Sequence, residues 1–124
     1  MNEQRWARAA ALCACCCALA VGAAPRELAG TVSKVTDGDS LWLQPAVQGK
    51  PIEVRLVNID APEICQAWGP QARDALKELV QGKQVAVRTA GTDEYHRTLA
   101  TLTLSSINVN TRLVEEGHAW SSRG

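Results

Sequence analysis

The strongest constraint on the fold comes from two short segments in which apolar and polar residues alternate, with residues 45–51 between them. In segment 40–44, Leu41 and Leu43 alternate with their neighbours, and segment 52–59 repeats the pattern with three aliphatic residues on one face. A period of two is typical of a strand with one buried face. Segment 46–51, AVQGKP, has the composition of a hairpin turn. The two strands are therefore predicted to pair antiparallel.

Three more strands are predicted at 28–35, 84–89 and 98–104. The clearest element is a helix between Pro70 and Gly82, because proline suits a first helical position and glycine a C-terminal stop. Apolar residues recur at helical spacing between them, at Ala72, Ala75, Leu76, Leu79 and Val80.

A second, short helix is predicted near the end of the chain. Asn110 is its expected N-cap, and Gly117 ends it. Val109 and Val114 are placed to form a hydrophobic staple around that cap. We also expect this helix and Trp120 to pack on the strands.

The predicted order is three strands, a helix, two strands and a helix. Short strands in a meander with an interposed helix favour a mainly β fold, a five-stranded barrel of the OB type with helices. An open α+β sheet has the same element order, and periodicity alone does not separate the two.

The first 24 residues have the layout of a secretory signal, with two arginines, an uncharged run of small and apolar residues, and then VGAAP. Cleavage is expected after Ala23 or Ala24, which predicts a secreted or periplasmic protein with no membrane association afterwards. A transmembrane anchor would need about 20 apolar residues. A lipoprotein signal at Cys15 has too short an apolar run before it. Residues 25–124 then form one small domain by length.

Removal of the signal changes the cysteine count and the charge. Cys65 alone remains of five cysteines, which argues against an internal disulfide or a Cys/His metal cluster in residues 25–124. The 13 basic and 13 acidic residues lose Arg5, Arg8 and Glu3, leaving 11 and 12 and a net charge of −1. A protein that holds nucleic acid through its global field is normally basic. Any polyanion must therefore be bound locally.

Several aspartates lie at the ends of the predicted strands, although aspartate is depleted from strands. Asp37 and Asp39 open the strand at 40–44, with Gly38 between them, and Asp60 follows the strand at 52–59. Singly, each is explained as a surface residue or turn former. Because the two strands form a hairpin, however, Asp39 and Asp60 are expected at the same end of the pair. Oxygen ligands without His or Cys select Ca²⁺ or Mg²⁺ rather than zinc or copper.

Neighbouring residues extend this candidate site. Pro62 favours an extended conformation at Ala61, which can turn the Ala61 carbonyl toward the metal, and Glu63 follows close by. Arg55 and Arg97 carry guanidinium forks that match phosphate oxygens. A Lewis acid, a base for water and positive charge for the developing anion are what phosphodiester hydrolysis requires.

At these residues the sequence resembles the staphylococcal nuclease (thermonuclease) family. The motifs VTDGDSLWL, VRLVNIDAPE, WGPQARDAL and DEYHRTLATL occur in the family's order and spacing, from about Leu28 to Trp120. The resemblance implies an OB-fold barrel and a Ca²⁺-dependent endonuclease that cleaves DNA and RNA, single strands preferred. Its products would carry 3′-phosphates and 5′-hydroxyls, and the protein would be a monomer.

The resemblance also implies the metal site. Asp39 and Asp60 match the side-chain ligands of the ion, and Ala61 matches the backbone-carbonyl ligand. Asp37 matches a carboxylate one water removed from the ion. Gly38 is expected to let the backbone bend so that both neighbouring aspartates face the metal.

The catalytic residues are implied in the same way. Glu63 occupies the position of the general base. Arg55 and Arg97 match the phosphate-binding arginines. Tyr95 matches a tyrosine that contacts the substrate phosphate.

The chain departs from the family's best-known pattern at several positions. Ala61 replaces a threonine, which should matter little for a carbonyl ligand. Glu94 replaces a lysine, and ICQAW replaces a lysine-rich loop, so we expect weaker substrate binding or compensation by Trp68 stacking on a base. Gly124 falls before the family's substrate-contacting tyrosines and final helix, so a shortened domain of low stability is expected.

Two other functions fit the predicted fold. One is a nucleic-acid-binding OB module without activity, and the other is a periplasmic oligosaccharide or peptide binder. The presence of every carboxylate and both arginines of the set favours the enzyme.

Overall fold

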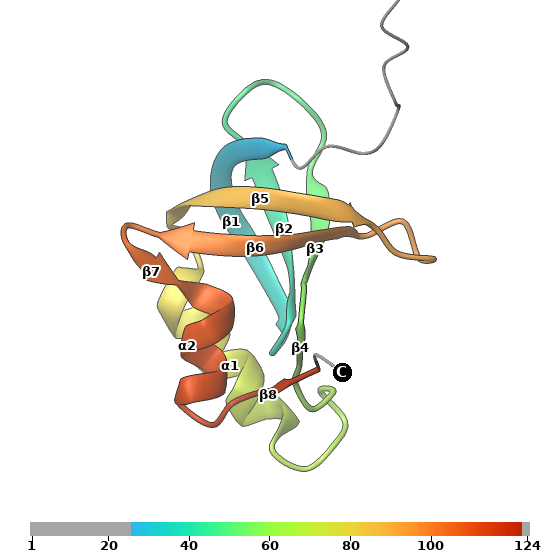
Figure 1. Ribbon diagram of the computed structural model, residues 1–124, viewed down its shortest axis with the longest axis vertical. Helices are drawn as coiled ribbons and strands as arrows, with labels where there is room; N and C mark the ends of the chain where they lie inside the picture. Colours follow the sequence, from blue (N-terminus) through green and yellow to red (C-terminus); the bar gives the residue numbers. More distant parts are fainter. Residues whose placement is uncertain (1–25, 123–124) are drawn as a thin grey trace, which may run out of the picture.

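The computed structural model describes residues 26–122, so the signal expected at residues 1–24 lies outside the described part of the chain. Five strands form a closed barrel (Figure 1), in the order β3-β2-β1-β5-β6, with β3 and β6 pairing in parallel to close it. Their bounds are β1 Glu27–Asp37, β2 Ser40–Pro45, β3 Ile52–Leu56, β5 Gln84–Thr92 and β6 Thr98–Leu104. The predicted OB-type barrel is confirmed, and the open sheet is excluded.

The long strand β1 makes the closure possible because it belongs to two antiparallel ladders. Its first half pairs with β5 and its second half with β2, and two register shifts after Val32 and Val35 bend it between them. Such bulges increase the local twist. At the crossing, a Cβ on Gly30 would lie 2.6 Å from the Gln44 carbonyl oxygen, so only glycine fits there.

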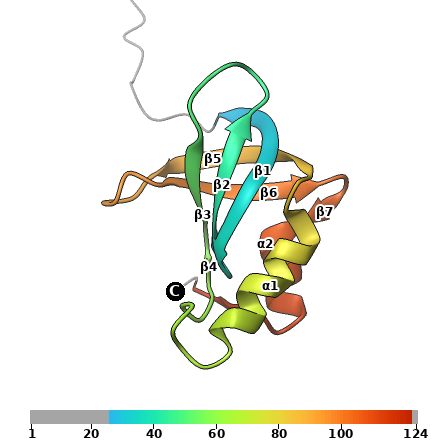
Figure 2. The ribbon, with the colours of Figure 1, turned by 180° about the vertical axis from the view of Figure 1, so that it is seen from behind.

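Alternate residues of the strands fill the barrel, and two helices cover one end of it (Figures 1 and 2). Helix α1, Gly69–Val80, buries Ala72, Leu76 and Val80 and packs on β1. Ala75 and Leu79 of the predicted stripe are only half-buried. The helix starts and stops close to the predicted Pro70 and Gly82.

The second helix, α2 (Val109–Glu115), begins two residues earlier than the sequence predicted. The prediction of Asn110 as N-cap is wrong, because the Asn108 side chain accepts the Thr111 amide at 3.0 Å. Asn110 is instead buried, and its amide bonds backbone groups of Val57, Ala100 and Leu102. With this cap, Val109 is the first helical residue, so it cannot form the expected staple.

Two predictions about neighbouring segments also need correction. The strand expected over 52–59 is interrupted at Asn58, whose φ is 64°, and a short β4 (Ile59–Asp60) then leaves the barrel. It pairs antiparallel with β8 (Trp120–Ser121), while β7 (Ile107–Asn108) extends β6. The prediction that Trp120 packs on the barrel is wrong, since 56% of its surface is exposed.

Among residues 26–122 no helix is both long and apolar enough to cross a membrane.

Candidate active site

Arg55 lies at the centre of the cluster of candidate residues. Its Nη2 donates to Asp60 Oδ1 at 2.6 Å and lies 3.3 Å from Asp39 Oδ2. Its Nη1 donates to the carbonyls of Ile59, at 2.9 Å, and Leu56. The β2–β3 register places Arg55 opposite Ser40. The chain continues past the turn at Asn58 into β4, whose Asp60 contacts the same guanidinium. One arginine thus joins the two aspartates.

Asp39 is held from several sides in the turn between β1 and β2. Only 7% of the residue is exposed. Its Oδ2 accepts the Ala61 amide at 2.9 Å, Ser40 Oγ donates to its Oδ1 at 3.2 Å, and its own amide donates to Asp37 Oδ1 at 3.2 Å. The Asp39 carboxylate therefore has a fixed position and orientation.

Gly38 permits this turn by its lack of a side chain rather than by an unusual backbone angle. A Cβ at this position would lie 2.7 Å from Ala61 Cβ and 2.8 Å from Ala72 Cβ. Gly38 is absent from the residues with positive φ. Glycine is therefore required here because the turn packs closely against the Ala61 segment and α1, and not for the backbone flexibility that was expected.

Burial, and after it the hydrogen bond and charge of the neighbouring Asp37, raise the pKa of Asp39, which lies at about 6 rather than 3.8. The hydrogen bond from the Ala61 amide and the charge of Arg55 act in the opposite direction. The charge of Arg55 therefore does not fully offset the cost of burying the Asp39 carboxylate. Additional positive charge would be favourable beside Asp39.

Arg97 joins the cluster through Ser40. Its Nη1 lies 3.3 Å from Ser40 Oγ, and its Nε donates to Asp93 Oδ2 at 2.8 Å. The Arg97 guanidinium carbon lies 5.4 Å from the centre of the Tyr95 ring, within cation–π range. Desolvation would raise the pKa of Asp93, but hydrogen bonds from the Arg97 and Tyr95 amides and from the Arg97 side chain hold it below 3.8.

A groove of about 290 Å³ runs beside these arginines. Arg55, Arg97 and Tyr95 line it together with Asn58 and Ser122 on the far wall. Asp93 and Glu94 line it as well, so the groove has an acidic side next to its two guanidinium groups. It offers both charge and an aromatic ring.

A hard cation needs several oxygen ligands. The Asp39 and Asp60 carboxylates both contact the Arg55 guanidinium, and the buried Asp39 carboxylate would be stabilised by a further positive charge, so both fit a cation that prefers oxygen. Within residues 26–122, however, no three His, Cys, Asp or Glu side chains converge closely enough to form a metal cluster. Any ion here would need backbone oxygens, such as the Ala61 carbonyl, and water to complete its shell.

Glu63 lies outside the cluster. It is exposed in the loop between β4 and α1, and its backbone exchanges hydrogen bonds with Gln66. In the described part of the chain, no hydrogen bond or ion pair joins its carboxylate to Arg55 or Asp39. The loop is anchored at its end, because Gly69 packs so closely against the Glu63 carbonyl that a Cβ would lie 1.9 Å from it.

Sequence reasoning missed two residues that organise the site. Ser40 connects Asp39 with Arg97, and Asp93 orients Arg97. The pairing of Asp93 with Arg97 could have been predicted, since Asp93 precedes Arg97 by four residues in a polar turn. Ser40 was not, because its partner Arg97 is 57 residues away.

A small OB-type barrel that gathers two aspartates and two arginines beside an open groove defines the class of this fold and site. The family described as "Staphylococcal nuclease homologue" matches residues 53–123. The chain belongs to the staphylococcal nuclease family.

Three curated relatives support this assignment. "Protein ParB" of Escherichia coli is 41% identical over 106 residues, which covers 78% of this chain and 59% of that protein. An "Uncharacterized endonuclease" of Haemophilus influenzae is 41% identical over 90 residues, covering 73% and 50%. A "Micrococcal nuclease" of Shigella flexneri is 35% identical over 106 residues, covering 78% and 60%. The chain thus spans about half to three fifths of the lengths of these relatives.

Proposed function

We propose that the protein is an exported endonuclease that hydrolyses phosphodiester bonds of DNA and RNA in the presence of Ca²⁺. The observation that carries the proposal is the joining of Asp39 and Asp60 by Arg55 next to a groove that also contains Arg97. Family membership and relatives whose names say nuclease or endonuclease support it.

Each residue has a task that follows from its chemistry. Asp39, Asp60 and the Ala61 carbonyl would hold the ion, with Asp37 fixing the Asp39 backbone. The bound Ca²⁺ would supply a Lewis acid for the phosphate oxygens. Arg97, already oriented by Asp93, would cover the charge that develops on the phosphate. Arg55 would share that task once it gives up one of its present partners.

Glu63 is proposed as the general base, and Tyr95 as a contact to the substrate. The exposed loop position leaves the Glu63 carboxylate accessible to water and substrate. Attack by water with departure of the 5′-oxygen would leave a 3′-phosphate and a 5′-hydroxyl. Single strands are the preferred substrate because only unpaired bases are free to stack on exposed rings.

The proposal extends to location and assembly. The signal-like segment at residues 1–24 supports export to a secreted or periplasmic location, with no membrane attachment after cleavage. The protein is proposed to act as a monomer.

Cleavage of single-stranded DNA and RNA with Ca²⁺, with Mg²⁺ and with excess EDTA tests the proposal. Cutting is expected with Ca²⁺ only, and the products should accept a 5′-label from a polynucleotide kinase without prior dephosphorylation. Undiminished cutting in EDTA, or products that need dephosphorylation first, would contradict it.

The separation of Glu63 from the cluster favours a second candidate, a non-catalytic nucleic-acid-binding module. Tight binding without cleavage under all conditions would support that alternative.

A further inference from the structure

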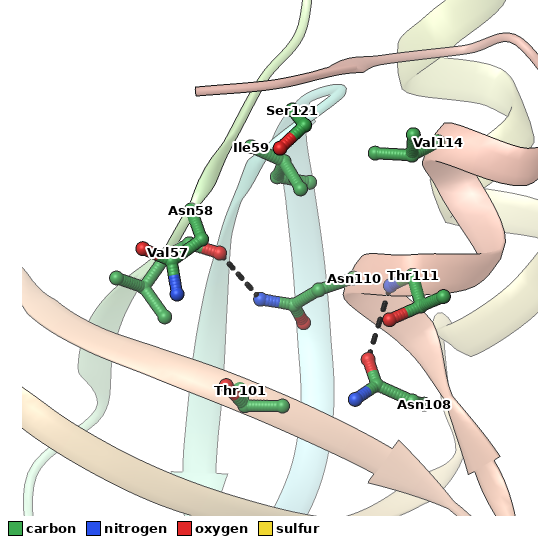
Figure 3. Close-up of a pocket in the computed structure, with 9 residues that line it drawn as sticks. All are labelled: Val57, Asn58, Ile59, Thr101, Asn108, Asn110, Thr111, Val114 and Ser121. Atoms are coloured by element: carbon green, nitrogen blue, oxygen red, sulfur yellow. Dashed lines mark hydrogen bonds between the residues drawn. The ribbon is translucent and has the colours of Figure 1, made fainter. Parts of the chain in front are cut away.

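The two-stranded ribbon formed by β4 and β8 has one face toward the helices and one toward the candidate site. Asp60 pairs with Trp120, and Ile59 pairs with Ser121. Ile59 and Ser121 line a cavity of about 220 Å³ between β4, β6 and α2, as Figure 3 shows. Because side chains alternate along a strand, Asp60 and Trp120 belong to the opposite face.

That opposite face is continuous with the groove beside the arginines. Ser122 lines the groove, and its amide donates to the Asn58 carbonyl at 3.1 Å, which continues the ribbon. Trp120 precedes Ser122 by two residues and therefore points to the same side, about 7 Å farther along the strand. Its partner Asp60 contacts Arg55, which also lines the groove. Trp120 thus lies just past the groove, beside Asp60.

The exposure of this side chain distinguishes it from an ordinary core tryptophan. Its exposed fraction is 56%, although the indole is among the largest apolar groups a chain can bury. Tyr95, within the groove, is 68% exposed and lies over Arg97. The site therefore presents two accessible rings at different positions, one inside the groove and one beyond Asp60.

We propose that Trp120 is a base-stacking residue that holds the unpaired nucleobase next to the phosphate bound at the arginines, outside the groove that contains Tyr95. This inference rests on the proposed function and deepens it by assigning a second nucleotide position. The flat face of an indole binds any base, so the contact would favour single-stranded substrates without sequence preference. A paired and stacked base could not make it.

The test combines protein variants with abasic substrates. A short single-stranded oligonucleotide with one preferred cleavage site is prepared with a single abasic residue at each position in turn. Cleavage is measured as kcat/KM, and binding of a labelled oligonucleotide in EDTA is measured by fluorescence anisotropy. Trp120→Leu keeps apolar bulk without a ring, and Trp120→Phe keeps a ring. Val47→Ala, which alters an exposed apolar residue in the β2–β3 loop, is the matched control.

One abasic position should reduce kcat/KM of the wild type on the order of 5- to 150-fold, the range expected for loss of one stacked base. In Trp120→Leu the same abasic substitution should not lower kcat/KM further. In Trp120→Phe and Val47→Ala it should still lower kcat/KM almost as much as in the wild type. In Tyr95→Leu, an abasic residue at a different position should be the one that no longer lowers kcat/KM. Circular dichroism of each variant verifies the fold.

Two outcomes would overturn the inference while leaving the proposed function intact. In one, the wild type cleaves, but each abasic substitution lowers kcat/KM of Trp120→Leu by the same factor as that of the wild type. In the other, the sensitive nucleotide couples to Trp68, an equally exposed tryptophan at the start of α1, tested as Trp68→Leu. If the wild type neither cleaves nor binds the oligonucleotide, the proposed function and the inference both fail.

Discussion

Arg55 and Asp60 form the shortest ion pair of the site, with 2.6 Å between Nη2 and Oδ1. The same nitrogen lies 3.3 Å from Asp39, so one guanidinium holds together a carboxylate of the β1–β2 turn and a carboxylate of β4. Because the side chains of Arg55 and Asp39 are only 18% and 11% exposed, water screens their contact less than that of Asp60, which is 44% exposed. The arrangement both stabilises the β4 segment and keeps the two carboxylates at one point.

Glu63→Gln should abolish most activity without affecting the fold, because the amide cannot accept a proton from water. A general base contributes typically about 10²–10⁴-fold to the rate. Single-turnover cleavage at saturating Ca²⁺ measures the loss, and Glu115→Gln, at an exposed position of α2, is the matched control. Cleavage by Glu63→Gln at the wild-type rate would show that another group activates the water.

Arg97→Ala should cost about 10²–10³-fold in kcat, the usual range for loss of one group that stabilises transition-state charge. Arg97→Lys should recover little, since an ammonium cannot bond Asp93 and Ser40 through the same planar fork. Arg73→Ala removes an arginine paired with Asp74 on the surface of α1 and should leave activity unchanged. Equal losses in Arg97→Ala and Arg73→Ala would point to general charge rather than to this site.

Asp39→Ala should weaken Ca²⁺ binding rather than the chemical step. Its activity should therefore recover in part at high Ca²⁺, whereas that of Glu63→Gln should not. The measurement is the initial cleavage rate across a Ca²⁺ titration, with calorimetric titration of Ca²⁺ as a readout independent of activity. An Asp39→Ala curve with an unchanged midpoint would remove Asp39 from the ligand set.

The raised pKa of Asp39 predicts a specific pH dependence of stability in EDTA. The folded state binds the proton more tightly than the unfolded state, with pKa values of about 6 and 3.8. The stabilising contribution is therefore complete below about pH 3.8 and is lost as the pH rises through about 6. The loss is on the order of 1–3 kcal/mol.

Urea unfolding at pH 4.5 and pH 7 checks this dependence, with Asp39→Asn as the reference. Groups such as Asp93, whose pKa is lowered, act in the opposite direction, and they cancel in the comparison because both proteins contain them. The wild type should lose more stability than Asp39→Asn between the two pH values. Identical changes in the two proteins would show that Asp39 is solvated normally.

Gly38→Ala should destabilise the fold and impair the site together. The added methyl would lie within 2.8 Å of the Cβ atoms of Ala61 and Ala72, and neither can rotate away. Overpacking of this kind costs about 1–3 kcal/mol, and each kcal/mol lowers the Tm of a domain this size by roughly 4–8 °C. Gly49→Ala, with its nearest neighbour at 3.9 Å, is the control and should melt like the wild type.

The five barrel strands, helix α1 and the meeting of Asp39 with Asp60 were predictable because they depend on local pattern. Alternation every two residues marks β2 and β3, and a hairpin between them brings the turn before β2 to the end of β3. That step needs no knowledge of distant segments. The family motifs likewise lie within short contiguous stretches, and the family assignment confirms the one drawn from them.

Tertiary contacts determine which of two similar residues takes each role. Asn108 and Asn110 both suit an N-cap, but the Asn110 side chain is buried, where it hydrogen-bonds backbone groups of Val57, Ala100 and Leu102. Barrel closure through β3 and β6, and the Ser40–Arg97 contact, join residues more than 40 positions apart. Trp120 was expected to pack on the strands, yet its pairing with Asp60 places it on the open face. Sequence periodicity describes which side of an element is apolar, whereas the partner that covers that side is determined by long-range packing.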